Sequence, residues 1–429
     1  MSLMGRSWAG LAPLAAPLLR RNLAARAGRG KEVATRLGER EGFGAGRAAG
    51  PLLWVHAASV GESLSALPLL RELAVRAPAL GFVVTTGTVA SAELLPARWP
   101  EGVRAAHRFA PLDVPGWVAR FLDGWRPDAA VFVESELWPN TLAALRARRV
   151  PTLLANARFS ERAARRWGRF APGLLREMLA GFAAVWPQTD GDAARLRARG
   201  AHAARVLGNL KWAADPLPGD AAALATLRAQ VGARPVFLAA STHPGEEASV
   251  LAAHRALLPR HPGLLSIVAP RHAARGAEVL AAIAAVPHAR RSLGAGPPPG
   301  AGIYVADTMG ELGLFYRLAS VAFVGGSLVP HGGQNPLEAA RLGCPVLLGP
   351  HHWNFADIVP PLLAAGAARL VPSAAHLAPL ADAVLRDPAP MGEAGRRVAA
   401  QSGEVAARMA DALLEALPPD VRSRMQMRG

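Results

Sequence analysis

The sequence predicts an α/β protein built from two doubly wound, Rossmann-like domains. The chain has 429 residues, more than one hydrophobic core usually organises, and 51% of them are hydrophobic. Short apolar runs alternate with amphipathic stretches in the order βαβαβ, which favours parallel sheets covered by helices on both faces. This alternation begins a second time after residues 208–219, so we expect two such domains in series.

Apolar runs and the stretches between them define the elements of each predicted domain. In the first domain, strands are expected at residues 52–57, 82–86, 129–133 and 152–155, with helices at 63–76 and 90–95. In the second, buried strands are expected at 236–240, 265–269, 303–306, 321–324 and 346–348, and a surface loop at 293–302. Ligands of open α/β sheets bind at the carboxyl ends of the strands, so a cleft between the domains is the expected site.

The predicted domain boundaries divide the chain into four parts. Residues 1–35 form a membrane-associating segment, and 36–207 form the first Rossmann-like domain. Residues 208–220 form the linker, and 221–429 form the second Rossmann-like domain together with the C-terminal helices.

The N-terminal segment has the pattern of an interfacial membrane anchor. Its apolar run, Trp8 to Leu19, contains two prolines and is shorter than the roughly 20 residues of a spanning helix. Basic residues follow this run, whereas a signal peptide carries its charges before it. An apolar wedge followed by basic residues is typical of a segment bound to anionic lipid, and an ordinary first helix is the alternative.

Composition narrows the function classes further. The chain carries 48 basic and 32 acidic residues, a net charge of +16, which favours an anionic partner. A single cysteine, Cys344, excludes an intrachain disulfide and a Cys-based zinc or iron–sulfur site. The sequence has no Walker A loop, no dinucleotide fingerprint after the first strand, and no zinc-protease or hydrolase-elbow motif, so nicotinamide, ATP and zinc chemistry lose support.

Two acidic motifs follow strands of the first domain. Glu62 lies in a strand-to-helix turn, where the helix N-terminus favours its ionised form, and it can act as a base or as a helix cap. Glu134 and Glu136 follow the strand at 129–133 and point to opposite faces if the backbone stays extended. Glu134 directly follows the apolar run and is expected to be the more buried of the two.

Cationic motifs follow in the same domain. Asn156-Ala-Arg158 begins a stretch in which Arg158, Arg162 and Arg165 share helical spacing, and this stripe either reads phosphate or is a solvated helix face. Gly208-Asn-Leu-Lys211 places a lysine at the domain junction as a plausible counter-charge to phosphate.

The second domain carries motifs suited to a nucleotide. Thr242-His243-Pro-Gly-Glu246 joins a strand to a helix and offers an anion nest. Gly332 and Gly333 precede a helix start and allow backbone amides close to a phosphate, and Glu338 is placed to bind ribose hydroxyls. Further candidates at strand ends are Arg271, His272, Met309, Gly310 and Glu311.

Taken in order from Arg36 to Phe355, these motifs resemble those of the 3-deoxy-D-manno-octulosonic acid (Kdo) transferases of lipopolysaccharide synthesis. The resemblance implies the GT-B architecture, two Rossmann-like domains facing a central cleft, at the cytoplasmic side of the cell inner membrane. It implies CMP-Kdo as donor, the lipid A precursor (lipid IVA) as acceptor, inversion at the transferred sugar, no metal or other cofactor, and no nucleic-acid partner.

The resemblance also implies residue roles. Glu62 matches the general base, and Glu134 and Lys211 match positions that stabilise the transition state. The segments that bind CMP match Arg271, His272, Met309, Gly310, Glu311, Asn335, Pro336, Leu337 and Glu338. Arg158, Arg162 and Arg165 remain candidates for the acceptor phosphates. Two alternatives stay open: another GT-B transferase that uses a UDP-sugar and a lipid-linked acceptor, and a non-enzymatic basic protein that binds lipid or nucleic acid.

Overall fold

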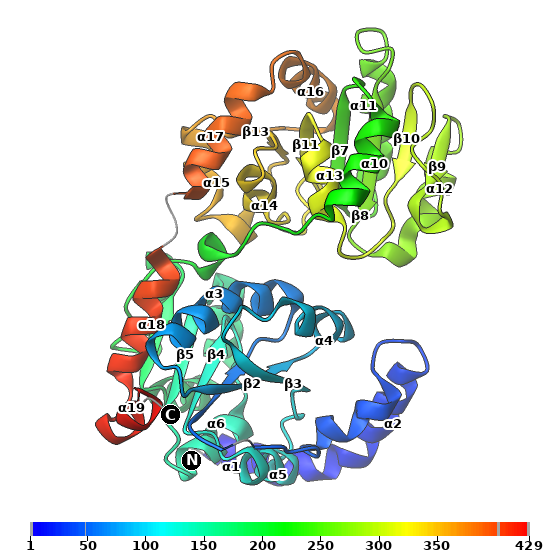
Figure 1. Cartoon of the computed structure of the whole chain (residues 1–429). Helices are drawn as coiled ribbons and strands as arrows, with labels where there is room; N and C mark the ends of the chain where they lie inside the picture. The colour runs from blue at the N-terminus through cyan, green and yellow to red at the C-terminus, as the bar shows by residue number, and fades with distance from the viewer. Residues whose placement is uncertain (1–2, 48, 401–403, 427–429) are drawn as a thin grey trace. The chain divides into compact units, whose positions relative to one another are not determined.

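The computed structural model describes residues 3–47, 49–400 and 404–426, which form two compact α/β units (Figure 1). The first unit runs to Ala214 and includes the C-terminal helices α18 (Glu404–Ala416) and α19 (Pro419–Gln426). The second unit begins at Asp215. None of the helices in the described part of the chain is long and apolar enough to cross a membrane.

The first unit contains a six-stranded parallel sheet in the order β3-β2-β1-β4-β5-β6. Its strands are β1 (Leu52–His56), β2 (Gly81–Thr86), β3 (Arg104–Phe109), β4 (Ala129–Val133), β5 (Thr152–Ala157) and β6 (Ala184–Pro187). This is the Rossmann strand order, whose direction reverses between β1 and β4. Ligands of such sheets bind outside the carboxyl ends of the strands at that switch point.

Alternating side chains of β1 divide the core of this unit between the two faces of the sheet. Leu53 and Val55 belong to the hydrophobic cluster on one face of the sheet, the first face. Leu52 and Trp54 belong to the cluster on the opposite, second face. The first face is covered by α3 (Val60–Arg76) and α18. The second is covered by α5 (Pro115–Trp125), α6 (Pro139–Ala147), α8 (Pro172–Ala180) and α9 (Asp190–Arg197). Helices on both faces explain why the central strands are apolar throughout.

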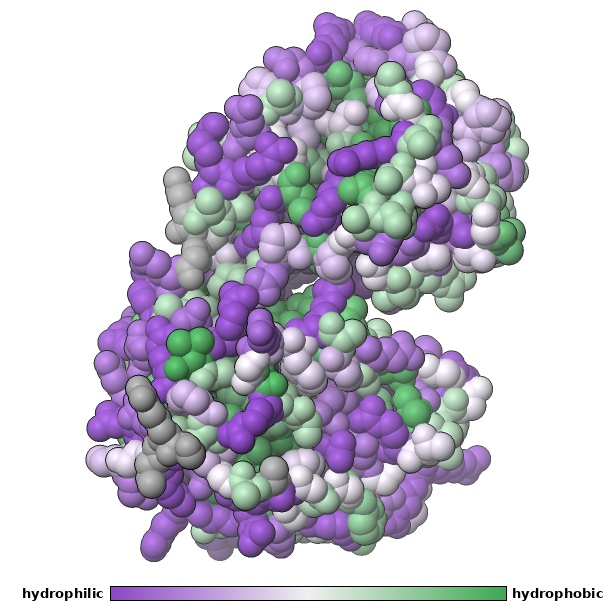
Figure 2. Space-filling model, viewed as in Figure 1, coloured by the Kyte–Doolittle hydropathy of each residue, from purple (hydrophilic) through white to green (hydrophobic). Residues whose placement is uncertain are grey.

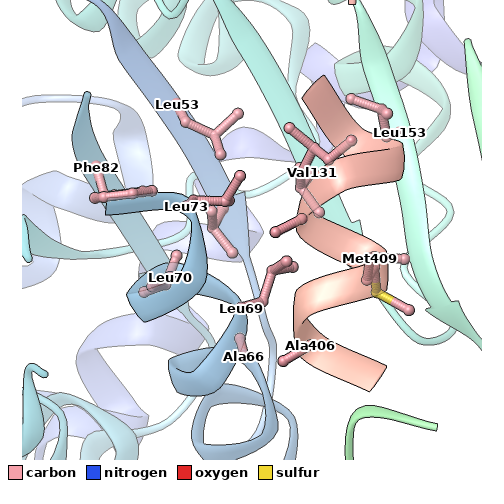
Figure 3. Close-up of a cluster of buried hydrophobic side chains, with 14 of the residues drawn as sticks. Leu53, Ala66, Leu69, Leu70, Leu73, Phe82, Val131, Leu153, Ala406 and Met409 are labelled. Carbon is pink, nitrogen blue, oxygen red and sulfur yellow. The ribbon is translucent and has the colours of Figure 1, made fainter. Parts of the chain in front are cut away.

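The C-terminal helices differ from the sequence-based boundary, which placed residues 221–429 in the second domain. Met409 and Leu413 of α18 are fully buried in the core of the first unit. Figure 3 shows Ala406 of α18 next to Ala66 and Leu69 of α3, and Met409 belongs to the same hydrophobic cluster. The apolar face of α18 completes this core, and the chain therefore returns to the first unit at its end. The expected linker is also shorter, because η4 (Leu210–Ala213) packs against α3 and α18.

The second unit contains a seven-stranded parallel sheet in the order β13-β12-β11-β7-β8-β10-β9. Its strands are β7 (Val236–Thr242), β8 (Leu265–Pro270), β9 (His288–Arg290), β10 (Gly302–Val305), β11 (Val321–Val324), β12 (Val346–Leu348) and β13 (Ala368–Leu370). Its helices are α10 (Ala221–Val231), α11 (Glu246–Leu257), α12 (Gly276–Ile283), α13 (Leu312–Leu318), α14 (Pro336–Arg341), α15 (Val359–Ala364), α16 (Leu377–Arg386) and α17 (Ala389–Ala400). The strand order reverses between β7 and β11. The predicted fold class, two doubly wound Rossmann-like domains, is confirmed.

The N-terminal segment packs on the first unit as α1 (Leu3–Leu11), η1 (Ala12–Ala15) and α2 (Ala16–Ala27). Helix α1 contacts α6 and α8. Figure 2 shows a mainly hydrophilic surface on the visible face of the protein, yet this segment exposes five large apolar side chains: Met4, Trp8, Leu11, Leu14 and Leu18. Two of its arginines form ion pairs within the unit, Arg20 with Glu41 at 2.6 Å and Arg26 with Glu32 at 3.2 Å.

Candidate active site

Glu62 lies in the first turn of α3, directly after the loop that follows β1 at the switch point of the first sheet. Ser59 is the N-cap of α3 and accepts a hydrogen bond from the Glu62 amide. The Glu62 carboxylate in turn accepts from the Ala58 amide at 2.8 Å and from the Ser59 hydroxyl at 2.9 Å. This arrangement is related to a capping box, with the carboxylate reaching the amide of Ala58, the residue before the N-cap, so Glu62 does cap the helix.

The surroundings of Glu62 make its carboxylate more basic than usual. Burial raises the pKa of Glu62 from its ordinary value of 4.5, and the charges of Glu134 and Glu136 raise it further. Hydrogen bonds from Ser59 and Ala58 act in the opposite direction and are outweighed. The helix N-terminus was expected to favour the ionised form, whereas burial and the two neighbouring carboxylates favour the protonated form. A half-buried carboxylate with a raised pKa is suited to accept a proton.

Glu136 is held by His56, an interaction that we did not predict from the sequence. The His56 Nε2 lies 3.1 Å from the Glu136 carboxylate, and the Trp138 indole donates to the same oxygen at 2.6 Å. Burial raises the pKa of Glu136, but the hydrogen bonds from His56 and Trp138 outweigh it and leave the pKa lowered. The signal was present in the motif Trp54-Val-His56, where a polar residue ends a buried strand next to β4.

Glu134 is paired with Lys211. Its side chain is buried, and the Lys211 Nζ lies 2.7 Å from its carboxylate. Glu134 has a φ of 64°, a left-handed conformation that side chains other than glycine rarely adopt. The backbone is therefore not extended at Glu134, so the condition under which Glu134 and Glu136 were expected on opposite faces does not hold. Their partners differ nonetheless: Lys211 for Glu134 and His56 for Glu136.

The arginines beside this group divide into two sets. Arg158 follows β5 directly; its carbonyl accepts from the Ser135 hydroxyl at 2.7 Å, and its amide donates to the Glu134 carbonyl at 3.4 Å. Arg162 and Arg165 lie on α7 (Glu161–Phe170) and are exposed. Arg165 pairs with Glu161 at 3.1 Å. The structure therefore brings Glu62, Glu134, Lys211 and Arg158 to the carboxyl ends of the central strands. Arg162 and Arg165 lie on a solvated helix face.

In the second unit, the turn after β7 is organised by a buried carboxylate. Glu246 accepts hydrogen bonds from the amides of His243 at 2.9 Å, Gly326 at 2.7 Å, Ser327 at 3.1 Å and Leu328 at 3.0 Å. It joins the turns that follow β7 and β11, the two strands of the switch point. Gly325 must be glycine here, because a Cβ would lie 2.6 Å from the Ser241 carbonyl oxygen.

Cationic side chains gather around His243. Its imidazole stacks on that of His331 with ring centroids 4.2 Å apart, and its Nε2 lies 3.1 Å from the Gln334 amide nitrogen. Burial lowers the pKa of His243 to about 4, and the charges of His331, Arg271, His272 and Arg275 contribute to the shift. Arg271 and His272 are exposed at the end of β8. This concentration of positive charge favours an anionic ligand.

The remaining nucleotide candidates lie in two turns of the same unit. Met309 is 61% exposed, and Gly310, which has a φ of 81°, is exposed as well. The Glu311 carboxylate is bound by Arg291 at 2.6 Å and by the Thr308 hydroxyl, and these hydrogen bonds lower the pKa of Glu311 against the effect of burial. The Glu311 carboxylate therefore stabilises the turn after β10 through its bonds to Arg291 and Thr308.

The turn that begins α14 offers a ligand its backbone and two side chains. Asn335 caps the helix, accepting from the Leu337 amide at 3.1 Å, and its own amide lies 3.3 Å from the Glu338 carboxylate. Pro336 and Leu337 are buried, so their side chains pack in the core. Within the described residues, no group of three or more His, Cys, Asp and Glu side chains is placed to hold a metal ion.

Solved structures share this fold. A glycosyltransferase from Rickettsia africae superposes with a TM-score of 0.59 at 12% identity, covering 87% of this chain and all of that one. A putative UDP-N-acetylglucosamine 2-epimerase from Listeria monocytogenes gives 0.57 at 15% identity, covering 85% of this chain and 96% of that one. These likenesses show the class of fold, two Rossmann-like domains in one chain, which in glycosyltransferases is called GT-B.

Within this class, the chain belongs to the Kdo transferase family. The family described as 3-deoxy-D-manno-octulosonic-acid transferase (kdotransferase) matches residues 35–214. The 3-deoxy-D-manno-octulosonic acid transferase of Bordetella pertussis is 39% identical over 87% of this chain and 90% of that protein. The corresponding enzyme of Haemophilus influenzae is 37% identical over 75% and 77%. The protein is thus a glycosyltransferase that transfers Kdo, and neither alternative left open by the sequence fits this family.

Proposed function

We propose that this enzyme moves Kdo from CMP-Kdo to the lipid A precursor (lipid IVA) with inversion, using Glu62 as general base and no metal. The observation that carries the proposal is the environment of Glu62, which raises its pKa while hydrogen bonds fix both carboxylate oxygens. A base positioned in this way contributes roughly 10²–10⁴-fold to a rate.

The reaction is a single displacement. Glu62 takes the proton of an acceptor hydroxyl, whose oxygen attacks the anomeric carbon of Kdo. The bond from that carbon to the phosphate oxygen breaks, and CMP leaves with the electron pair. Attack from the face opposite the leaving group gives inversion. Lys211, held on Glu134 at 2.7 Å, contributes a fixed cation where charge is redistributed.

The second unit supplies the groups for the donor. Arg271 suits the CMP phosphate and the carboxylate of Kdo because it supplies a guanidinium beside His243, and the imidazoles of His272 and His331 add hydrogen-bonding groups there. Accessible groups for the nucleoside are Met309, Gly310, Asn335 and Glu338. These charges provide the electrostatic stabilisation that other transferases obtain from a divalent ion.

The first unit binds the acceptor and the membrane surface. Arg158, Arg162 and Arg165 are the candidates for binding its phosphates. Trp8, Leu11, Leu14 and Leu18 are each more than half exposed and follow one another at roughly helical spacing, as in a segment lying in the lipid interface. The expected location is the cytoplasmic side of the inner membrane, without a nucleic-acid partner.

The test compares Glu62→Gln with a matched cap variant. Asp192 has the same position in α9 as Glu62 in α3, and its carboxylate accepts from the N-cap Thr189 hydroxyl at 2.6 Å. Transfer from CMP-Kdo to lipid IVA is measured for wild type, Glu62→Gln and Asp192→Asn. The proposal predicts that only Glu62→Gln loses turnover at unchanged fold. Equal turnover of Glu62→Gln and wild type would refute the assignment of the base.

A further inference from the structure

Two asparagines of the sequence motifs have no role in the mechanism above. Asn156 is the penultimate residue of β5, in the motif Asn156-Ala-Arg158, and Asn209 precedes η4 in Gly208-Asn-Leu-Lys211. Both are buried, with 0% and 2% of their surface exposed. Amide side chains are costly to bury unless they make specific hydrogen bonds, so their partners indicate what they do.

Asn156 is an outlier in three respects. It has a φ of 53°, the β5–β6 register shifts between Leu154 and Ala157, and its Nδ2 is buried without a hydrogen-bond partner in the described part of the chain. Such features persist when the surrounding structure requires them, and they concentrate at functional sites. The contact that Asn156 makes in return is with η4: its Oδ1 accepts from the Leu210 amide at 2.9 Å.

Asn209 binds the backbone amide that follows the one bound by Asn156. Its Oδ1 accepts from the Lys211 amide at 3.0 Å, and its Nδ2 donates to Gln188 Oε1 at 3.4 Å. Gln188, also buried, donates from Nε2 to the Asn156 carbonyl at 3.0 Å. Asn156, Gln188 and Asn209 therefore form one buried amide network, and two of them hold successive backbone amides of η4.

Because the backbone of this turn is held by hydrogen bonds, the position of the Lys211 Cα is fixed. Its Nζ reaches Glu134 at 2.7 Å, and Glu134 directly follows β4, the strand adjacent to β5. Ordering a free lysine side chain costs roughly 2 kcal/mol of entropy, and a backbone held in place favours one arrangement of the pair.

We propose that Asn156 and Asn209 are positioning residues that hold the Leu210–Lys211 turn, so that Lys211 neutralises Glu134 and sets the electrostatic environment of Glu62. The proposal deepens the function above and rests on it. Glu134 and Glu136 are the charged groups that act on Glu62, and Glu136 is already held by His56 and Trp138. Of the two carboxylates, Glu134 is the one whose charge depends on Lys211 for compensation.

A double-mutant cycle separates positioning from general destabilisation. Turnover and KM for CMP-Kdo are measured for Asn209→Ala, Lys211→Met and the double variant. We expect Asn209→Ala to lower kcat about tenfold or more with little change in KM, as misplaced catalytic groups do. In the Lys211→Met background, the same change should alter kcat less than twofold. Multiplicative losses in the double variant would overturn the proposal.

Three further variants separate the loss of these hydrogen bonds from a general loss of stability. Asn209→Ser retains an acceptor oxygen and should recover most of the lost turnover, and Asn156→Gly accommodates the left-handed backbone while removing the amide. Asp220→Ala removes one cap of the same kind from α10, where Asp220 Oδ1 accepts from Ala223 at 2.7 Å.

The pH profile provides the second readout. The acidic limb of kcat/KM should move to higher pH in Asn209→Ala and Asn156→Gly but not in Asp220→Ala. An unmoved limb in the first two variants would contradict the proposal. A wild-type enzyme without transfer from CMP-Kdo would instead refute the proposed function, so the two failures are distinguishable.

Discussion

We propose that Glu62 combines two roles that the sequence presented as alternatives, helix cap and base. Its carboxylate caps the start of α3, and its environment raises its pKa. We predict that Glu62→Gln lowers kcat by about 10²–10⁴-fold, because the amide cannot take a proton. Single-turnover transfer at saturating CMP-Kdo measures the loss in the chemical step.

The same substitution should have an unusual effect on stability. Because the folded pKa of Glu62 is raised, its contribution to stability is fully present below about 4.5 and is lost as pH rises through the folded pKa. Glutamine does not titrate. The melting temperature of Glu62→Gln relative to wild type should therefore rise between pH 4 and pH 7. A difference that falls over this range would contradict the raised pKa.

His107 of β3 predicts a loss of stability in acid. Burial lowers its pKa to about 4 from 6.5, with Arg36 contributing, and its Nε2 lies 2.9 Å from the Thr86 hydroxyl. The unfolded chain takes up the proton first, so stability is present above 6.5 and lost as pH falls towards 4. The loss amounts to about 3 kcal/mol. Denaturant unfolding should show this loss in wild type and not in His107→Gln, and the exposed His288→Gln serves as control.

At the scale of elements, the packing of α18 in the core of the first unit should contribute to the stability of that unit. Met409 and Leu413 are 0% exposed against α3 and the sheet. Met409→Ala should cost about 2–5 kcal/mol, because it leaves a cavity in that core. Hydrogen exchange should report loosening in α3 and the first sheet while the strands of the second unit keep their protection. Equal loosening of both units would be inconsistent with this packing.

The sequence predicted the central strands and missed the outer ones. The nine strands it predicted match β1, β2, β4, β5, β7, β8, β10, β11 and β12. Those it missed, β3, β6, β9 and β13, are the edge strands of the two sheets. Central strands are buried on both faces and read as apolar runs, whereas β3, Arg-Ala-Ala-His-Arg-Phe, is stabilised by tertiary contacts that no local pattern reveals.

For the candidate site, the sequence likewise predicted some features and missed others. The residues of the site could be located from polar side chains that follow buried strands, and Glu62, Glu134, Arg158 and Lys211 do lie at the carboxyl ends of the central strands. The partners could not be predicted, because His56–Glu136 and Asn156–Leu210 join segments 80 and 54 residues apart. The membership of α18 was missed for a related reason: its apolar stripe fits the core of either unit until the packing is known.

At the scale of the whole molecule, the exposed apolar residues of α1 to α2 predict membrane binding. Replacing Leu11, Leu14 and Leu18 by serine should weaken binding to anionic vesicles at least about 100-fold, since each buried leucine contributes roughly 1.5–3 kcal/mol. Vesicle sedimentation measures this, with Val75→Ser as a control for an exposed apolar residue elsewhere. Unchanged binding of the triple variant would show that this segment is not the anchor.

The central claim is that this Kdo transferase uses CMP-Kdo and the lipid A precursor. Its most direct test is incubation of the purified enzyme with CMP-Kdo and tetra-acylated lipid A precursor in detergent that preserves the fold, with products read by mass. We predict a product heavier by the mass of one or more Kdo residues, together with release of CMP. An unchanged acceptor mass under those conditions would contradict the proposed donor and acceptor.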